Sequence, residues 1–144
     1  MVLFNTMNKT TNNIYIAVID DDESIRLSMS RLLRAAHFQP ITYSSAEAFL
    51  TDTNRPLFSC LVLDIQLKGM SGLELSERLC AVKDSTPVIF ITAHDTLEAR
   101  KRAEASSCAS YFRKTDSGDE ILAAIHRAIS VGDSALLMGG CKDS

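Results

Sequence analysis

Three short apolar runs constrain the fold of this chain most strongly. They span residues 14–19, 59–63 and 87–91, are rich in β-branched side chains, and each is followed by a polar residue. Unbroken runs of this length are typical of strands buried on both faces of a parallel sheet. Two weaker runs, at residues 39–43 and 109–113, are less apolar, as edge strands tend to be.

Helical patterns lie between these runs. Apolar residues spaced by three and four positions mark one face of a helix. Three sets follow this spacing, the second more loosely: Ile25, Met29, Leu32, Leu33 and Ala36; Leu73, Leu75, Leu79 and Val82; and Ile121, Ile125, Ala128 and Ile129. Asp116 or Ser117 is a candidate N-cap for the last helix.

The alternation of strands and helices predicts an α/β fold. We expect a (βα)5 chain that forms a doubly wound parallel sheet of five strands in the order 2-1-3-4-5, the flavodoxin-like arrangement. Residues 1–13 are predicted to be a flexible leader, and residues 131–144 a tail or truncated linker. The folded domain is then expected to span residues 14–130.

Composition excludes several classes of protein. The 144 residues are enough for one domain, and 46% hydrophobic with 23% charged residues argues against disorder and a coiled coil. A net charge of −3 predicts no direct nucleic-acid binding, and no apolar run is long enough to span a membrane. The four cysteines lack zinc-ligand spacing, and no signal peptide precedes the domain, so a cytoplasmic location is expected.

Polar side chains follow the strands at one edge of the predicted sheet. Asp20 and Asp21 come after the first strand, Asp64 after the third and Thr92 after the fourth, and the fifth delivers Lys114. In a doubly wound sheet, ligands bind at the carboxyl ends of the strands, where the strand order reverses. We therefore expect these side chains to meet at one site.

Their chemistry suits phosphoryl transfer. Carboxylates that lie close together repel and need a cation, and Mg²⁺ prefers carboxylates together with phosphate oxygens and water. Asp64 stands alone on the central strand and is the candidate nucleophile, which would form an aspartyl phosphate. Asp20 and Asp21 are the candidate metal ligands, with Asp64 as a third. Thr92 and Lys114 would contact the remaining phosphoryl oxygens.

A simpler interpretation exists for each residue alone. Acidic residues after strands often cap the next helix, which is the interpretation we prefer for Asp22 and Glu23. Asp20 and Asp21 by themselves would not establish a metal site. Only the combination of four strand ends favours the functional interpretation.

The sequence resembles the receiver domain of bacterial two-component response regulators. The similarity covers about residues 15–129, and part of it resembles receivers attached to helix-turn-helix transcription regulators. It is carried by these segments: 18–26 (VIDDDESIR), 61–64 (LVLD), 70–72 (MSG), 88–93 (VIFITA) and 111–114 (YFRK), with 44–50 (SSAEAFL) as the mark of the subgroup.

The resemblance implies a signalling domain rather than an enzyme. A sensor histidine kinase or phosphotransfer protein would phosphorylate Asp64, and Mg²⁺ would also bind the backbone carbonyl of Gln66. Thr92 matches the switch hydroxyl, Tyr111 the switch aromatic residue, and Lys114 the lysine of the family motif.

The family's output implies a change on the face made by the fourth helix, the fifth strand and the fifth helix. Phosphorylation-dependent homodimers would form there. The fourth helix, however, has few large apolar residues and many charged ones: Glu98, Arg100, Lys101, Arg102 and Glu104. A solvated charged face is therefore an equal alternative.

Three positions depart from the family pattern. Thr115 replaces the usual proline after Lys114, Lys68 replaces a proline after the phosphoacceptor, and Ser107-Cys108 replaces a Gly-Ala pair. Because a non-proline cis bond costs about 3–4 kcal/mol, we expect the Lys114–Thr115 bond to be trans.

Two residues are expected to control the lifetime of the phosphoryl group. Gln66 and His94 lie two positions beyond Asp64 and Thr92, respectively. Their side chains can overhang the site and obstruct or orient attacking water.

Two other functions stay open at this point. A haloacid-dehalogenase-type phosphatase would use Asp20 as its nucleophile, but it would leave Asp64 idle and needs a further acidic motif. A receiver-like binding module that is never phosphorylated is the second alternative.

Overall fold

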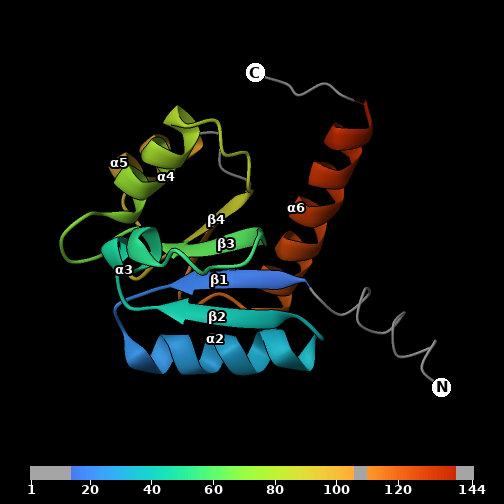
Figure 1. Ribbon diagram of the computed structural model, residues 1–144. Helices are drawn as coiled ribbons and strands as arrows, with labels where there is room; N and C mark the ends of the chain where they lie inside the picture. The colour runs from blue at the N-terminus through green and yellow to red at the C-terminus, as the bar shows by residue number, and fades with distance from the viewer. Residues whose placement is uncertain (1–13, 106–109, 139–144) are drawn as a thin grey trace.

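The chain folds around a five-stranded parallel sheet with helices on both faces (Figure 1). The computed structural model describes residues 14–105 and 110–138. The strand order is β2-β1-β3-β4-β5, which confirms the predicted 2-1-3-4-5 arrangement. The strands are β1 (Tyr15–Ile19), β2 (Gln39–Tyr43), β3 (Phe58–Asp64), β4 (Val88–Thr92) and β5 (Ser110–Arg113).

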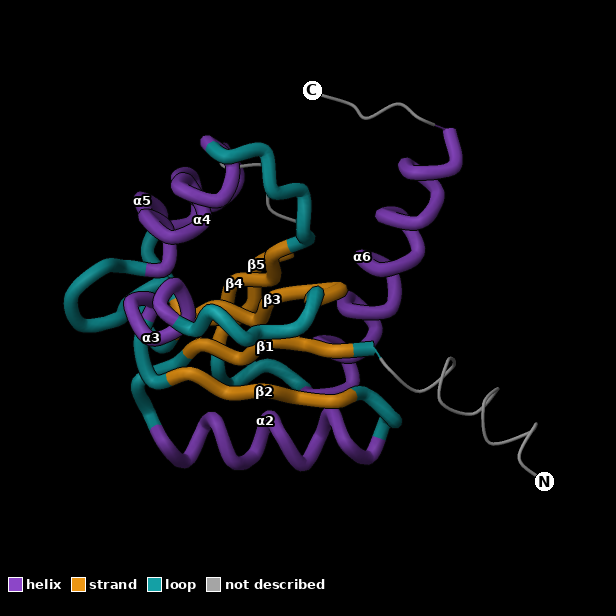
Figure 2. The backbone as a smooth tube through the Cα atoms, viewed as in Figure 1, coloured by secondary structure: helices purple, strands orange, loops and turns teal. Residues whose placement is uncertain are grey.

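A helix follows each strand (Figure 2). The helices are α2 (Glu23–Ala35), α3 (Ala46–Thr51), α4 (Gly72–Ala81), α5 (Leu97–Ala105) and α6 (Gly118–Met138). Apolar spacing predicted α2, α4 and α6, but it did not mark the other two. α3 is only 6 residues long, and α5 buries just Ala103, so neither carries a full apolar stripe.

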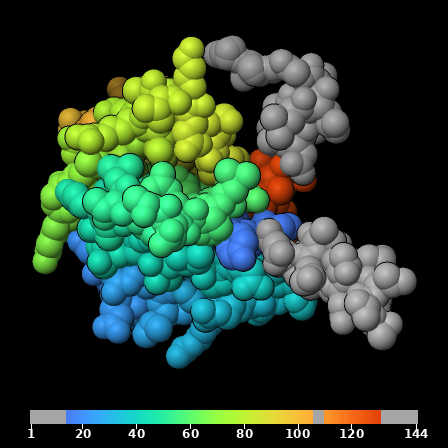
Figure 3. All heavy atoms as spheres, viewed as in Figure 1, coloured from blue at the N-terminus to red at the C-terminus, as the bar shows by residue number. Residues whose placement is uncertain are grey.

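The sheet separates two apolar layers. Successive strand residues point to opposite faces, so each strand serves both layers. On one face Ala17, Leu63 and Phe90 pack against α3, α4 and α5. On the other face Val18 and Val62 pack against α2 and α6. The helices bury both faces of the sheet, and Figure 3 shows the packed molecule from one side. Polar groups can then gather at the carboxyl ends of the strands.

Local capping fixes where the helices begin. The Asp22 carboxylate accepts a hydrogen bond from the Ser24 N–H, which confirms the capping role expected for Asp22. For α6 the cap is Ser117, whose hydroxyl accepts from the Asp119 N–H at 3.1 Å. Asp116 instead closes the turn after β5, where its carboxylate accepts from the Arg113 N–H at 2.9 Å.

The ends of the chain bear on the predicted domain limits. α6 continues through residues 131–138, the first part of the predicted tail. The predicted leader, residues 1–13, lies outside the described residues, as do Ser107 and Cys108. The limits of the domain at 14 and 130 stay a prediction. Among the described helices, none is both long enough and apolar enough to cross a membrane.

Gly72 allows the start of α4 to lie against the end of β3. Its N–H donates to the Ile65 carbonyl at 3.0 Å. A Cβ at this position would lie 2.1 Å from the backbone oxygen of Asp64. That separation is far below van der Waals contact, and backbone atoms cannot move aside as a flexible side chain can. Only glycine therefore permits this approach beside Asp64.

We predict that Gly72→Ala lowers the free energy of unfolding by about 2–3 kcal/mol, because the new methyl group must displace the backbone around Asp64. Urea unfolding followed by circular dichroism measures the change. Gly118→Ala is the matched control, since its Cβ would meet only the Leu32 side chain, at 3.1 Å. We expect the control to stay within about 1 kcal/mol of the wild type. Equal losses in both variants would contradict this explanation.

Candidate functional site

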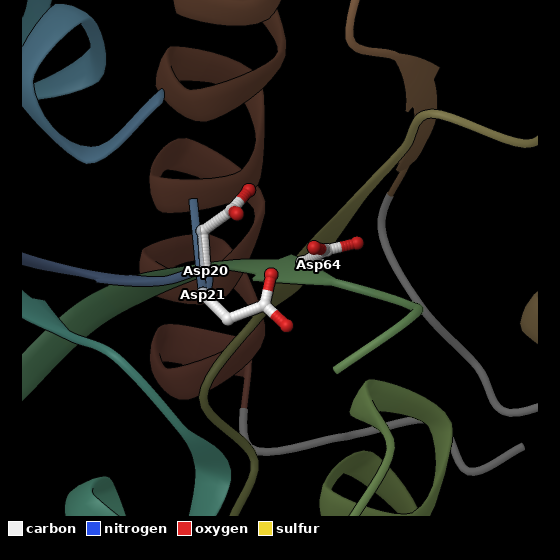
Figure 4. A group of neighbouring side chains, drawn as sticks. All are labelled: Asp20, Asp21 and Asp64. Atoms are coloured by element: carbon white, nitrogen blue, oxygen red, sulfur yellow. The ribbon is translucent and has the colours of Figure 1, made fainter. Parts of the chain in front are cut away.

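Three carboxylates gather at the carboxyl ends of β1 and β3 (Figure 4). Asp20 and Asp21 follow β1, and Asp64 is the last residue of β3, the strand that pairs directly with β1. One carboxylate oxygen of each residue lies within 4.8 Å of the other two. The structure thus brings together the three acids that the sequence predicted as a cluster.

Two of these acids are buried, and neighbouring backbone groups orient them. Asp20 is 0% exposed and Asp64 2%, whereas Asp21 is exposed. The Asp22 N–H donates to Asp20 Oδ1 at 2.9 Å, and the Gln66 N–H donates to Asp64 Oδ1 at 3.0 Å. Each buried carboxylate is therefore held by the residue two positions further along the chain.

Lys114 links the two buried acids. Its Nζ donates to Asp20 Oδ1 at 3.2 Å and to Asp64 Oδ2 at 3.1 Å. Burial alone would lower the pKa of Lys114, but its hydrogen bonds to the two carboxylates outweigh that effect and raise the pKa. The ammonium group stays charged and partly neutralises the pair.

The surroundings of Asp64 work against its ionisation. Burial, and then the charge of Asp20, raise the pKa of Asp64 to about 6, although the Gln66 N–H and Lys114 lower it. Lys114 therefore offsets only part of the cost of two neighbouring buried carboxylates. A further cation would relieve the rest.

The donor set fits a divalent cation. Asp20 Oδ2 is buried and lies 2.9 Å from Lys114 Nζ, but it accepts no well-oriented hydrogen bond, alone among the buried side-chain polar atoms of the described residues. A hard ion such as Mg²⁺ binds carboxylate oxygens of this kind. Asp20, Asp21 and Asp64 could hold such an ion. The role of the Gln66 carbonyl as a further ligand stays a prediction.

Thr92 ends β4, one residue after the strand partner of Asp64, and is fully buried. Its hydroxyl donates to the His94 carbonyl and accepts from the His94 N–H, both at 3.0 Å. Its backbone carbonyl accepts from the Lys114 N–H at 2.8 Å, which joins the ends of β4 and β5. The bond between Lys114 and Thr115 is trans, as predicted. Lys114 thus reaches both acids without a cis bond.

Gln66 and His94 contact each other at the rim of the site. Gln66 Oε1 lies 2.7 Å from His94 Nδ1, so the loops after β3 and β4 are joined by a side-chain hydrogen bond. The sequence predicted that each side chain could overhang the site. It did not predict their mutual contact, because the two residues are 28 positions apart.

Two residues that support the site were missed in the sequence. The Glu47 carboxylate accepts from the Met70 N–H at 2.8 Å and so ties α3 to the loop between Asp64 and α4. Arg26 donates to the Asp20 carbonyl at 2.7 Å. Both residues lie in segments that carry the family resemblance. No pattern of apolar or polar spacing in the sequence predicts these contacts.

We predict that Lys114→Met lowers the free energy of unfolding by about 2–4 kcal/mol near pH 8 without divalent ions, because two buried carboxylates lose their cation. The pKa of Asp64, already raised to about 6, should rise further. The folded state then binds protons more readily than the unfolded state, so the loss should grow as the pH rises above about 6 and shrink below it. Urea unfolding at several pH values measures this. Lys101→Met, at an exposed position, is the control, and a pH-independent loss would contradict the argument.

The model of the response regulator receiver domain matches residues 16–126. The chain is 32% identical to the response regulator protein TodT of Pseudomonas putida, over 81% of this chain and 51% of TodT. It is 30% identical to the transcriptional regulatory protein FixJ of Bradyrhizobium diazoefficiens, over 87% of this chain and 61% of FixJ. The chain thus spans about half the length of the curated relatives that it matches.

Solved structures agree with the sequence comparisons. The response regulator StyR has a TM-score of 0.75 at 33% identity, over 88% of this chain and 64% of that one. FixJ-N has a TM-score of 0.75 at 30% identity, over 82% of this chain and 94% of that one. A CheY-like receiver from Methanospirillum hungatei, at 21% identity and a TM-score of 0.78, shares the fold. With the family model spanning most of the described residues, the chain belongs to the receiver domains of two-component response regulators.

Proposed function

We propose that this receiver domain accepts a phosphoryl group on Asp64 from a sensor histidine kinase or a phosphotransfer protein. The observation that carries the proposal is the position of Asp64, a carboxylate only 2% exposed that ends the central strand and lies 3.1 Å from Lys114 Nζ. Asp20 is the neighbouring buried acid. This arrangement combines a nucleophile with groups that hold charge around it.

In the proposed reaction, an Asp64 carboxylate oxygen attacks the phosphorus of a phosphohistidine. The new O–P bond forms as the P–N bond breaks, and the imidazole leaves with the electron pair and takes up a proton. Lys114 contacts one phosphoryl oxygen, and the Thr92 hydroxyl donates to another once it turns from His94. Asp64 and Lys114 are already in place, so the Thr92 hydroxyl is the group that must change its partner.

Mg²⁺ is the proposed cofactor. Asp20, Asp21, Asp64 and the Gln66 carbonyl would hold it, and the buried Asp20 oxygen that accepts no well-oriented hydrogen bond supports this assignment. When bound, the ion supplies positive charge that offsets repulsion between the carboxylates and the phosphoryl oxygens.

Neither alternative function is favoured. A phosphatase of the haloacid-dehalogenase type would need Asp20 as its nucleophile, and it would leave Asp64, which shares the Lys114 ammonium group with Asp20, without a role. The family match also supports a receiver instead. The binding-module alternative leaves the assembled cluster of Asp20, Asp21 and Asp64 without a role.

The proposed output is a change on the face formed by α5, β5 and α6, with Thr92 and Tyr111 as switch residues. Relatives such as FixJ are named transcriptional regulatory proteins, so control of transcription through further residues of the protein is the proposed consequence. Action in the cytoplasm, where histidine kinases present their phosphoryl groups, fits this role.

We predict that labelled acetyl phosphate in millimolar Mg²⁺ phosphorylates the wild type and that Asp64→Asn reduces labelling to background, because the amide oxygen is a poor nucleophile. Asp21→Asn should slow labelling by about tenfold or more through loss of a metal ligand. Asp22→Asn is the matched control: it changes a neighbouring acid that caps α2, and asparagine also caps helices. Labelling that persists in Asp64→Asn would reject the assignment of the phosphoacceptor.

The bonded pair Gln66 and His94 should control the lifetime of the phosphoryl group. We predict that Gln66→Ala together with His94→Ala changes the rate of autodephosphorylation about tenfold, because the side chains that obstruct or orient the attacking water are then missing. Loss of label after removal of the donor measures this rate. The initial rate of labelling serves as the control and should change less than the lifetime. An unchanged lifetime would show that water access is controlled elsewhere.

Phosphorylation should favour a homodimer through the α5-β5-α6 face. Leu97, at the start of α5, is 69% exposed and offers apolar area for such a contact. We predict that beryllium fluoride with Mg²⁺, a phosphoryl mimic, raises the sedimentation coefficient of the wild type and that Leu97→Glu weakens the effect. Leu57→Glu is the control, because Leu57 is 92% exposed but lies just before β3. An unchanged monomer would reject the dimer.

A further inference from the structure

Asp95, in the loop between β4 and α5, contacts residues of two other elements. Its Oδ1 accepts a hydrogen bond from the Tyr111 hydroxyl of β5 at 3.0 Å. Its Oδ2 pairs with the Arg100 guanidinium of α5 at 2.9 Å. Arg100 also lies over the Tyr111 ring, 4.5 Å from the centroid. Asp95, Arg100 and Tyr111, here called the Asp95 cluster, thus hold the Tyr111 hydroxyl at the surface.

The same loop holds the buried Thr92 hydroxyl. Thr92 bonds to both backbone groups of His94, the residue that precedes Asp95. Tyr111 pairs with Phe90 in the sheet, so β4 and β5 fix the backbones of the two side chains relative to each other. Thr92 and Tyr111 are therefore bound to adjacent residues of one loop. A change in the path of that loop must affect both.

We propose that Asp95 is a positioning residue that couples the hydrogen bonding of Thr92 to the orientation of Tyr111. The inference rests on the proposed phosphorylation of Asp64. A hydroxyl has one hydrogen to donate, so Thr92 must release the His94 carbonyl before it can donate to a phosphoryl oxygen. The loop then loses the hydrogen bond between Thr92 and His94, the residue before Asp95. The Asp95 cluster opposes movement of the loop because it holds the loop in its present path.

The strength of the Asp95 cluster suits such a role. The side chains of Arg100 and Asp95 are 42% and 27% exposed, so their ion pair is weak, whereas a phenol that donates to a carboxylate makes a stronger bond. Hydrogen bonds from Arg100 and then Tyr111 lower the pKa of Asp95 and keep it ionised. A cluster of modest strength favours one path of the loop without making it permanent. The coupling is reciprocal, so a change at Thr92 affects Tyr111 and a change at Tyr111 affects Thr92.

Removal of the Asp95 carboxylate tests the coupling. We expect Asp95→Ala and Tyr111→Phe each to raise the rate of labelling by acetyl phosphate about two- to tenfold, since the loop is freed from its unphosphorylated path. The double variant should be no faster than either single variant, because both remove the same hydrogen bond. Arg102→Gln is the matched control: Arg102 lies on α5 and pairs at 3.6 Å with Glu77, outside the Asp95 cluster, and its removal should leave the rate unchanged.

A spectroscopic measurement separates positioning from a general effect on stability. The chain has 3 tyrosines, so NMR of a ring-labelled sample gives few signals, and Tyr111→Phe identifies that of Tyr111. Beryllium fluoride with Mg²⁺ should shift the Tyr111 signal in the wild type. Asp95→Ala alone should shift it part of the way in the same direction.

The outcomes distinguish this inference from the function on which it rests. A wild-type chain that acetyl phosphate does not label would reject the proposed function. If the wild type is labelled, an equal or slower rate in Asp95→Ala overturns the coupling. A Tyr111 signal that beryllium fluoride does not move overturns it as well. Faster labelling together with the partial shift supports it.

Discussion

The contact of Lys114 with two buried carboxylates is the interaction on which the site depends. Asp20 and Asp64 lie at the ends of neighbouring strands and would repel each other without a cation. The lysine arrives from β5, at the edge of the sheet, and the bond from its N–H to the Thr92 carbonyl holds its backbone there. The strand order thus decides which charges meet.

Rigid and adjustable parts of the site are carried by different elements. Asp20, Asp64 and Lys114 stand at strand ends, where backbone pairing and burial hold them. The side chains that can change partner bond to loop residues: the Thr92 hydroxyl bonds to the His94 backbone, and the His94 side chain bonds to Gln66. The proposed phosphorylation of Asp64 requires a fixed acceptor and a surface that can change, and this division permits both.

Much of the fold could be predicted from the sequence because its signals are local. The apolar runs of β1, β3 and β4 report burial on both faces, and the stripes of α2 and α6 report burial on one. Apolar spacing did not mark α3 and α5, because a short helix and a mostly exposed helix carry no apolar stripe, and these two helices were expected from the (βα)5 alternation alone. The sequence also left open whether Asp116 or Ser117 caps α6, since either side-chain oxygen could accept the hydrogen bond. In the structure the Asp116 carboxylate bonds to Arg113 in the turn after β5, and Ser117 is the cap.

For the site, the sequence by itself determined which chemical groups stand at the strand ends, because each follows its apolar run directly. Only the tertiary structure decided how they pair. The ion pairs of Lys114 join residues 94 and 50 positions apart, and no periodic pattern encodes such a contact. The same holds for the bond between Glu47 and Met70, the approach of Gly72 to Asp64, and the Asp95 cluster. These contacts depend on how the packed layers bring loops together, a property of the whole fold and of no single segment.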